Sequence, residues 1–435
     1  MTDSAPLRLA IAGLGTVGAG VIKLLEVNRD LVARRAGRPI EVVAISARDR
    51  SKDRGVDLSP YEWVDDMASL AERADIDAVV ELIGGSDGPA LTLARQCLGR
   101  GKTLVTANKA MVAHHGLELA REAERTGGAL KYEAAVAGGV PVIKGLRDGA
   151  AANRITRVYG ILNGTCNYIL STMEKEGSAF FDVLEEAQAK GFAEADPTFD
   201  IDGIDAAHKL AILASLSFGA EVDFPSVDIT GIRHVLAADI REAAALGCRI
   251  RLIGMAECAG DGAETGLFQR VHPMLVPMTH PLAHVDGALN AVVAEGNFVG
   301  RLFFQGAGAG EGPTASAVVA DVIDVARDET GPAFAMPAQW LQHYPKADAG
   351  ARTGRVYLRF LVQDRPGVLA EITAATRDAG VSIESVIQRA EPADGGVMVA
   401  IVTHPGALAC IEDTLRGLGG SDSLIGAPVV MHILD

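Results

Sequence analysis

The chain has 435 residues, more than one hydrophobic core normally organises, so we expect two to four domains. Hydrophobic residues make up 49% of the sequence and charged residues 22%, a balance typical of folded globular proteins. The formal net charge of -16 argues against nucleic acid as a partner, because an acidic surface repels phosphate groups. Since no uninterrupted apolar run of about 18 residues occurs, we expect no membrane span.

The cysteines are scattered and never spaced as C-x-x-C, which argues against a disulfide framework and against a cysteine-rich zinc site. The N-terminus has no basic region followed by an apolar run, and such a region is needed for a secretory signal. Both observations favour a cytoplasmic protein.

Short apolar runs alternate with helical stretches through the first third of the chain. We expect a strand at 7–12, then the glycines at 13–18 and a helical stretch through residue 25. Further strands and helices are expected, in chain order, at 41–46, 78–82, 90–98, 103–106, 111–125 and 130–133. This alternation predicts an α/β fold, a doubly wound sheet of the Rossmann type over residues 1–132.

The first strand is followed directly by a G-x-G-x-x-G pattern that opens a helix. Glycines at these positions allow a tight turn and the close approach of a pyrophosphate, which the free N–H groups of the helix N-terminus bind. We expect a dinucleotide site here rather than a purely structural turn, formed by Gly13, Gly15, Thr16, Val17 and Gly18.

The end of the second strand bears on the choice between NADP and NAD. Arg48 and Arg50 lie where a 2′-phosphate would be held, whereas Asp49 between them suits the ribose hydroxyl of NAD. A solvated charged loop is the third interpretation. The sequence favours NADP through Arg48 and leaves NAD open.

Lys109 ends the segment T-A-N-K at the carboxyl edge of the expected sheet, where ligands of open α/β sheets bind. A lysine there can contact a substrate or take part in proton transfer. The alternative is an ordinary surface lysine, and the segment alone does not decide between the two.

Asp205 and Lys209 are four residues apart on a helix expected from 202 to 216, and they share one helical face. Their neighbours are apolar, which favours partial burial over an exposed ion pair. Asp202 can serve simply as the helix cap. His208 is more typical of a packing histidine than of a ligand.

The remaining chain divides by pattern. Residues 133–305 mix glycine-rich turns, helices and apolar runs, which predicts an α+β catalytic and dimerisation domain. A segment at about 306–345, with a helical pattern at 315–326, is expected to return to the first domain. Small and polar residues at 346–354 are typical of a linker. Residues 355–435 follow the β-α-β-β-α-β order of a ferredoxin-like domain.

Several motifs, taken in order, resemble the homoserine dehydrogenase family. Besides the glycine loop and T-A-N-K, they are Y-E-A-A-V-A-G-G-V-P at 132–141, G-x-L-N-G-T-x-N at 160–167, A-x-P-T-x-D-I-x-G-x-D-A-A-x-K at 195–209 and G-A-G-A-G-E-G-P-T-A-S-A-V at 306–318. The segment D-R-P-G-V-L at 364–369 resembles an ACT domain, a module that binds amino acids, often at a dimer interface. A domain that only dimerises is the alternative.

The resemblance implies NAD(P)-dependent interconversion of L-homoserine and L-aspartate 4-semialdehyde, on the route to threonine, methionine and isoleucine. It implicates Lys109 and Lys209 in catalysis, steadied by Asp205. It places the homoserine ammonium group beside Glu194, Asp200 and Asp205. Lys109 would also touch the cofactor, as would Gly310 in a glycine-rich loop, 306–312, that closes near the nicotinamide.

The resemblance also implies a monovalent cation, sodium by expectation. Its ligands would be mainly the backbone carbonyls of Glu133, Val136, Gly138 and Val140, and hard cations do prefer oxygen ligands. An ordinary glycine-rich turn is the alternative. For regulation and assembly, the resemblance implies threonine as the effector and a homodimer or homotetramer.

Two other functions compete. Another amino-acid semialdehyde dehydrogenase would use a cysteine–histidine pair; Cys166 beside Thr165 raises the question of a thiol nucleophile, but no histidine is visibly placed to activate it. A non-catalytic amino-acid sensor would tolerate loss of the lysines and carboxylates, and all of these are present.

Overall fold

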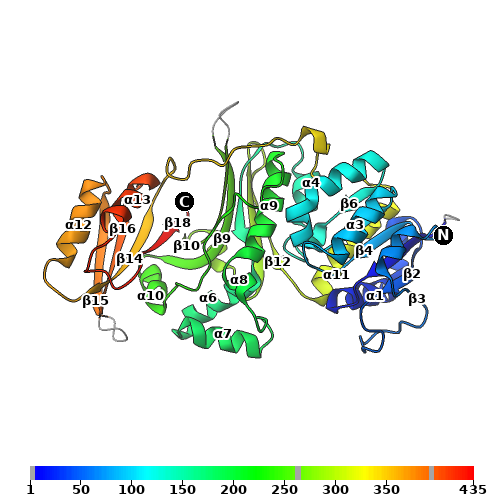
Figure 1. Cartoon of the computed structure of the whole chain (residues 1–435), viewed down its shortest axis with the longest axis horizontal. Coiled ribbons are helices and arrows are strands. Elements are labelled where there is room, and N and C mark those ends of the chain that lie inside the picture. Colours follow the sequence, from blue (N-terminus) through cyan, green and yellow to red (C-terminus); the bar gives the residue numbers. More distant parts are fainter. Residues whose placement is uncertain (1–4, 260–265, 391–395) are drawn as a thin grey trace.

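The computed structural model describes residues 5–259, 266–390 and 396–435, which form three parts in a row (Figure 1). The N-terminal part is built on a six-stranded sheet, and the middle part on a larger mixed sheet. The C-terminal part is a smaller α/β unit that extends the mixed sheet. Within the described ranges, no helix is both long enough and apolar enough to cross a membrane.

All pairings in the N-terminal sheet are parallel, in the order β3-β2-β1-β4-β5-β6. The direction of this order reverses between β1 and β4, and dinucleotides bind at the carboxyl ends of strands that flank such a reversal. The doubly wound fold expected from the sequence is confirmed. The strands are β1 (Leu7–Ala12), β2 (Ile40–Ser46), β3 (Glu62–Trp63), β4 (Ala78–Glu81), β5 (Thr103–Thr106) and β6 (Ala129–Lys131).

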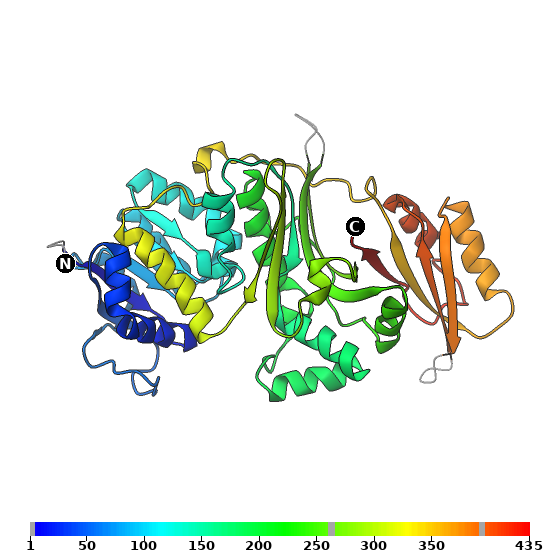
Figure 2. The ribbon, with the colours of Figure 1, turned by 180° about the vertical axis from the view of Figure 1, so that it is seen from behind.

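A late segment of the chain packs on this first sheet. Helix α11 (Glu311–Ala326) lies beside α1 (Thr16–Val27), as Figure 2 shows. Gly20 permits the close approach, because a Cβ atom there would lie 2.7 Å from the Glu311 side chain. The other helices of this part include α3 (Pro89–Gly99) and α4 (Lys109–Thr126).

The mixed sheet runs in the order β12-β11-β7-β9-β10-β18-β14-β16-β15. Helices α6 (Gly164–Glu176) and α9 (Ile204–Phe218) pack against it and share one apolar core with it. The helix that was expected from residue 202 begins at Ile204, after Gly203 in a left-handed conformation with φ of +87°. The strands of the middle part are β7 (Ile155–Ile161), β9 (Cys248–Ala259), β10 (Gly266–Pro277), β11 (Leu289–Gly296) and β12 (Gly300–Ala307).

The C-terminal unit has the expected β-α-β-β-α-β order. Its four strands lie as β18-β14-β16-β15, with the two helices packed on each other. The elements are β14 (Val356–Gln363), α12 (Val368–Asp378), β15 (Ile383–Ala390), β16 (Gly396–Thr403), α13 (Leu408–Gly417) and β18 (Val429–Ile433).

This unit is not joined to the middle part by a free linker. The start of the segment 346–354 pairs with the start of β10, where the Ala347 N–H donates to the Leu267 carbonyl at 3.0 Å. Its end pairs with the two residues that precede α13, with Thr353 opposite Ala407. The small residues that suggested flexibility serve close packing instead, because a Cβ on Gly266 would lie 3.1 Å from Ala347. The last strand, β18, pairs directly with β10, with Met274 opposite His432. The two units therefore share one continuous sheet.

A buried ion pair reinforces the junction. Asp239, on α10 (Ala237–Ala245), is fully buried and forms an ion pair with the Arg359 guanidinium of β14, with Oδ1 2.9 Å from Nε. The Tyr357 hydroxyl donates to the same carboxylate at 3.0 Å. Removing one partner of a buried pair leaves an uncompensated charge, so these contacts tie the C-terminal unit firmly to the middle part.

Candidate active site

The glycine loop after β1 has three different steric requirements. Gly13 has φ of +100°, and a Cβ there would lie 2.5 Å from the Leu82 carbonyl oxygen. A Cβ on Gly18 would lie 2.1 Å from the Gly13 oxygen, so helix and turn can approach only without side chains. At Gly15, the N-cap of α1, nothing lies within 4 Å. That open space, in front of Thr16 and Val17 in the first helical turn, suits a pyrophosphate.

The loop after β2 uses its acidic residue internally. The Asp49 carboxylate accepts from the Ser51 N–H at 2.8 Å and hydroxyl at 2.7 Å, and the hydroxyl bond lowers the pKa of Asp49 most. Arg54 donates to the Leu14 carbonyl at 2.8 Å and thereby fixes the glycine loop. Arg48 is exposed and has no ion-pair partner among the described residues. It is thus left available for an anionic ligand.

Asp205 lies at the centre of the polar cluster that the sequence predicted. Its Oδ1 is 3.0 Å from the Lys109 Nζ, and its Oδ2 is 2.7 Å from the Lys209 Nζ. The carboxylate is only 3% exposed. Burial alone would raise the pKa of Asp205, but the two ammonium groups outweigh it and hold that pKa well below the ordinary carboxyl value. The three side chains therefore remain charged together.

The two lysines differ in their surroundings. Lys209 is buried, and its Nζ also donates to the Leu162 carbonyl at 2.8 Å. Lys109, at the first residue of α4, is partly exposed and lies 5.7 Å from the Phe199 ring centre. The nearby Asp205 charge raises the pKa of Lys109. A fixed ammonium and a more accessible one thus face the same carboxylate.

Asn163 is a site residue to which sequence reasoning assigned no role. Its Nδ2 donates to Asp200 Oδ1 and to Asp205 Oδ2, both at 2.8 Å, so it bridges the two carboxylates. Its Oδ1 caps α6 by accepting from the Cys166 N–H at 2.8 Å. The L-N-G-T segment was the available signal, because Asn directly before a helical pattern is a preferred cap.

The residues proposed to bind the substrate ammonium group differ in burial. Asp200, on α8 (Thr198–Ile201), is partly buried and accepts from the Thr165 hydroxyl at 3.2 Å; burial and the Asp205 charge raise the pKa of Asp200. Glu194 lies in the loop after α7 (Phe180–Ala189) and is exposed. Its charge still reaches Lys109, whose pKa it helps to raise. Asp202, considered as a helix cap, pairs with Arg233 instead.

Cys166 is fully buried, and its Sγ donates to the Asp200 carbonyl at 3.2 Å. Burial raises the pKa of Cys166 well above that of a free thiol. Since the thiolate is the nucleophile in thioester chemistry, this cysteine is unsuited to covalent catalysis.

The segment from Glu133 to Val140 offers main-chain oxygens. Among the described residues, no donor points at the carbonyls of Val136 and Gly138, whereas the Val140 oxygen accepts from Val142 N–H at 2.8 Å. The Glu133 carboxylate is occupied by the backbone N–H groups of Ile143 and Lys144. Burial raises the pKa of Glu133 to about 7. Free carbonyls beside a buried carboxyl group fit a hard cation.

The glycine-rich loop before α11 lies against this segment. A Cβ on Gly138 would lie 2.4 Å from the Gly308 oxygen, and the Gly139 N–H donates to the Ala307 carbonyl at 3.0 Å. Gly310 is the N-cap of α11, with φ of +118°. The loop thus reaches the cofactor side of the first sheet while resting on the second domain.

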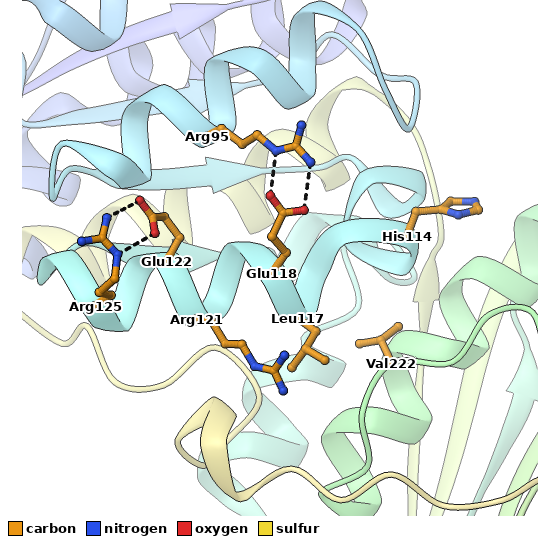
Figure 3. A pocket seen from close by; sticks show the side chains of 8 residues that line it. All are labelled: Arg95, His114, Leu117, Glu118, Arg121, Glu122, Arg125 and Val222. Carbon is orange, nitrogen blue, oxygen red and sulfur yellow. Dashed lines mark hydrogen bonds and ion pairs between the residues drawn. The ribbon is translucent and has the colours of Figure 1, made fainter.

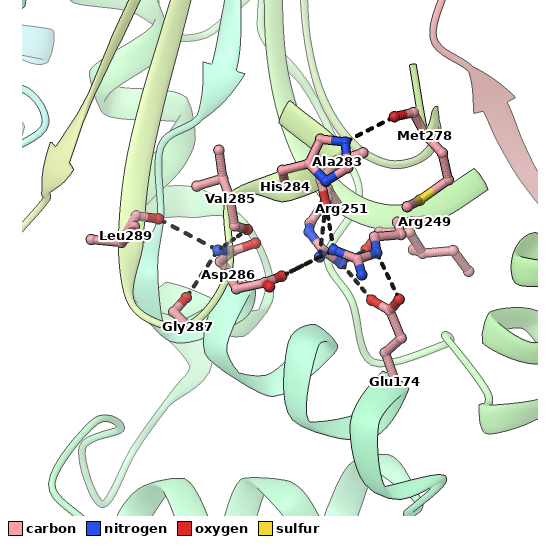
Figure 4. Close-up of polar contacts among 12 residues, drawn as sticks. Glu174, Arg249, Arg251, Met278, Ala283, His284, Val285, Asp286, Gly287 and Leu289 are labelled. Carbon is pink, nitrogen blue, oxygen red and sulfur yellow. Dashed lines mark hydrogen bonds and ion pairs between the residues drawn. The ribbon is translucent and has the colours of Figure 1, made fainter. Parts of the chain in front are cut away.

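Behind the site, a charged network anchors α6 (Figure 4). The fully buried Arg251 side chain donates to Asp286 at 2.9 Å and to Glu174 at 3.2 Å. Asn167 donates to the Val285 and Gly287 carbonyls, each at 2.9 Å. These contacts hold the helix whose N-cap is Asn163.

Family models match three consecutive regions: "Homoserine dehydrogenase, NAD binding domain" at 13–133, "Homoserine dehydrogenase" at 141–323 and "ACT domain" at 356–420. The homoserine dehydrogenase of Pseudomonas aeruginosa is 44% identical and that of Neisseria gonorrhoeae 41%, each with 98% of both chains covered.

Solved structures give the same result. A crystal structure of a homoserine dehydrogenase from Thiobacillus denitrificans matches with a TM-score of 0.92 and 41% identity, over 99% of both chains. A hyperthermophilic archaeal homoserine dehydrogenase in complex with NADPH matches with a TM-score of 0.64 and 26% identity, over 76% of this chain and all of that one. On this evidence, the chain belongs to the homoserine dehydrogenase family of NAD(P)-dependent oxidoreductases and carries a C-terminal ACT domain.

Proposed function

We propose that the lysine pair on Asp205 is the catalytic centre at which this homoserine dehydrogenase interconverts L-homoserine and L-aspartate 4-semialdehyde. The observation that carries the proposal is the double ion pair, 2.7 Å to Lys209 and 3.0 Å to Lys109, on one buried carboxylate. A carboxylate with two cations leaves one net positive charge. Such a charge suits an oxygen that becomes an alkoxide in the transition state.

In the oxidative direction the substrate hydroxyl gives its proton to Lys209 in its neutral amine form, and the carbon that bears the hydroxyl loses a hydride. The nicotinamide cofactor, when bound, supplies the hydride acceptor. Lys209 stabilises the developing alkoxide oxygen with its ammonium group, and in the reductive direction donates the proton to the aldehyde oxygen. Asp205 orients both lysines through its two ion pairs, and Lys109, at the more open side, assists and touches the cofactor.

The substrate ammonium group is assigned to the acidic side of the same cluster. Asp200 and Asp205 lie on either side of Asn163, and Glu194 closes the site from its exposed loop. Burial first, then the Asp205 charge, raises the pKa of Asp200. Asp200 has no ion-pair partner among the described residues, and a substrate ammonium group would supply one.

For the cofactor, NADP is proposed over NAD. Arg48 is unpaired within the described ranges, whereas Asp49 is held by Ser51. Contacts with the dinucleotide are assigned to the glycine loop, Arg48, Lys109 and Gly310. A sodium ion is proposed on the carbonyl oxygens of Glu133, Val136, Gly138 and Val140, where it would brace the turn against the loop around Gly308.

For regulation, L-threonine is proposed as the effector that the ACT domain binds, with the enzyme acting as a homodimer or homotetramer in the cytoplasm. A sensor without catalysis is disfavoured, because the lysines and carboxylates lie together at contact distances.

The test is absorbance at 340 nm with L-homoserine and each oxidised cofactor in turn. We expect reduction of both, faster with NADP, and a further increase when NaCl replaces choline chloride. No absorbance change with either cofactor would overturn the proposal, and an unchanged rate without sodium would remove the cation from it.

A further inference from the structure

A second contact joins the two helices that carry the active-site lysines. The Nε2 atoms of His114, on α4, and His208, on α9, lie 3.2 Å apart. His208 directly precedes Lys209, and His114 lies little more than one turn after Lys109. The contact therefore links the same two helices as the ion pair between Lys109 and Asp205.

The imidazoles lie in an aromatic environment. The His208 ring centre is 4.3 Å from that of Phe224 and 5.4 Å from that of Phe199, and the His114 ring is 4.9 Å from Phe224. His208 is 3% exposed, whereas His114 is exposed to solvent. Figure 3 shows His114 at one end of a row of α4 side chains, pointing away from the Arg95–Glu118 pair.

The surroundings indicate which ring donates. Nδ1 of His208 is buried and has no hydrogen-bond partner among the described residues. If His208 were the acceptor, that atom would carry an unsatisfied N–H. With His208 as the donor through Nε2–H, Nδ1 keeps only a lone pair, which is less costly to bury. His114 then accepts through the lone pair of its Nε2.

We propose that the His114–His208 hydrogen bond is a positioning contact for catalysis: it holds α4 against α9 so that the Lys109 ammonium stays on Asp205. The inference rests on the proposed role of Lys109. Neither imidazole touches the reacting atoms, so both act through the lysine.

The contact is sensitive to protonation. A proton on Nε2 of His114 would remove the lone pair and oppose two N–H groups. The charges of Lys109 and Lys209 oppose protonation of His208, and the charge of Asp205 favours it. Asp87 lies near enough to His114 for a charge on that ring to lower the pKa of Asp87. Burial first, then the His114 charge, lowers the pKa of His208 to about 4.

The test compares His114→Leu, which removes the acceptor, with His114→Gln, whose amide oxygen accepts but does not titrate. We expect His114→Leu to lower kcat about tenfold at pH 8 and to change the KM for homoserine, whose ammonium group is assigned to the carboxylates, less than twofold. His114→Gln should keep kcat within about twofold of wild type, because its amide oxygen restores the acceptor. His115→Gln is the matched control, because His115 bonds Asp87 instead.

A double-mutant cycle separates this inference from the proposed function. In a Lys109→Ala background, His114→Leu should cost little more, because both changes remove the same interaction. A full additional tenfold loss there would overturn the positioning role, as would wild-type kcat in His114→Leu or a tenfold loss of kcat in His114→Gln. Wild-type activity of Lys109→Ala alone would instead overturn the assigned role of Lys109, and with it this inference.

Discussion

The Lys109 Nζ and the Asp205 Oδ1 lie 3.0 Å apart although their helices pack against different sheets. Lys109 begins α4 at the carboxyl edge of the parallel sheet, and Asp205 lies in the first turn of α9 against the mixed sheet. The proposed catalytic centre therefore lies where the two domains meet. Any change in their relative position alters the charge pattern at the reacting oxygen.

Lys209→Ala should lower kcat by about 10² or more, because it removes the buried ammonium beside the developing charge. The loss of a cation also leaves Asp205 with Lys109 and Asn163 as partners, so we expect the fold to survive. Steady-state kinetics and circular dichroism provide the check, with the exposed Lys190→Ala as control. Near-normal turnover by folded Lys209→Ala would remove Lys209 from the mechanism.

Glu194→Gln should raise the KM for homoserine about tenfold and leave kcat within a few fold. The carboxylate would pair with the substrate ammonium at an exposed rim, where charge pairs contribute less than in the interior. Initial rates over a range of homoserine concentrations measure this. Glu185→Gln, on α7 outside the site, serves as control, and an unchanged KM in Glu194→Gln would contradict the assignment.

Arg48→Ala should weaken NADP binding more than NAD binding, because only NADP has the 2′-phosphate that the guanidinium would pair with. We expect the ratio of kcat/KM values for NADP over NAD to fall about tenfold. Lys52→Ala, a cation of the same exposed loop, should change both cofactors equally. An equal loss for both cofactors in Arg48→Ala would contradict the preference for NADP.

L-threonine should inhibit the full chain, and truncation after about residue 348 should abolish the inhibition. A flexible linker at 346–354, as the composition predicts, would leave the activity and stability of the truncated enzyme unaffected. The structure changes that expectation, because truncation removes β18 from β10 and Arg359 from Asp239. We therefore expect a lowered melting temperature as well. Persistent inhibition of the truncated enzyme would place the effector site in the catalytic part.

His280 should make stability depend on pH. It is 7% exposed, and burial lowers its pKa to about 4 from the ordinary 6.5. The unfolded chain therefore binds a proton between pH 6.5 and 4 that the native state does not, and the free energy of unfolding falls as the pH is lowered through that window. The effect is at most about 3 kcal/mol. In urea denaturation, His280→Gln should show a shallower loss; identical pH dependence in both proteins would contradict this origin.

Local signals predicted most of the fold. Apolar runs marked five of the six parallel strands within two residues, whereas the two-residue strand β3 was not expected. The glycine loop, Lys109 and the Asp205–Lys209 pair were found from spacing or resemblance. Contacts between distant segments were out of reach. Nothing local shows that Asn163 bridges Asp200 and Asp205, because each side chain comes from a different helix or helix end.

The expected linker at 346–354 shows the same limit. Its small and polar residues are typical of a flexible segment. Whether such residues are mobile or closely packed depends on the surface of the fold that lies beside them, which the segment itself does not reveal. Here that surface is β10, where Gly266 leaves room for Ala347. Helix α9 also begins two residues later than expected, at Ile204 instead of residue 202. Asp202 forms an ion pair with Arg233, and Gly203 takes a left-handed conformation.

The insertion of β18 between β10 and β14 constrains how the protein is made. The ribosome synthesises this strand after the other strands of the mixed sheet, although it lies near the middle of that sheet. Until it emerges, one edge of β10 stays open, and an open strand edge invites pairing with other chains. The open edge of β10 in a nascent chain therefore needs protection from pairing with other chains. A nonsense mutation that removes β18 would leave both the ACT domain and the mixed sheet incomplete.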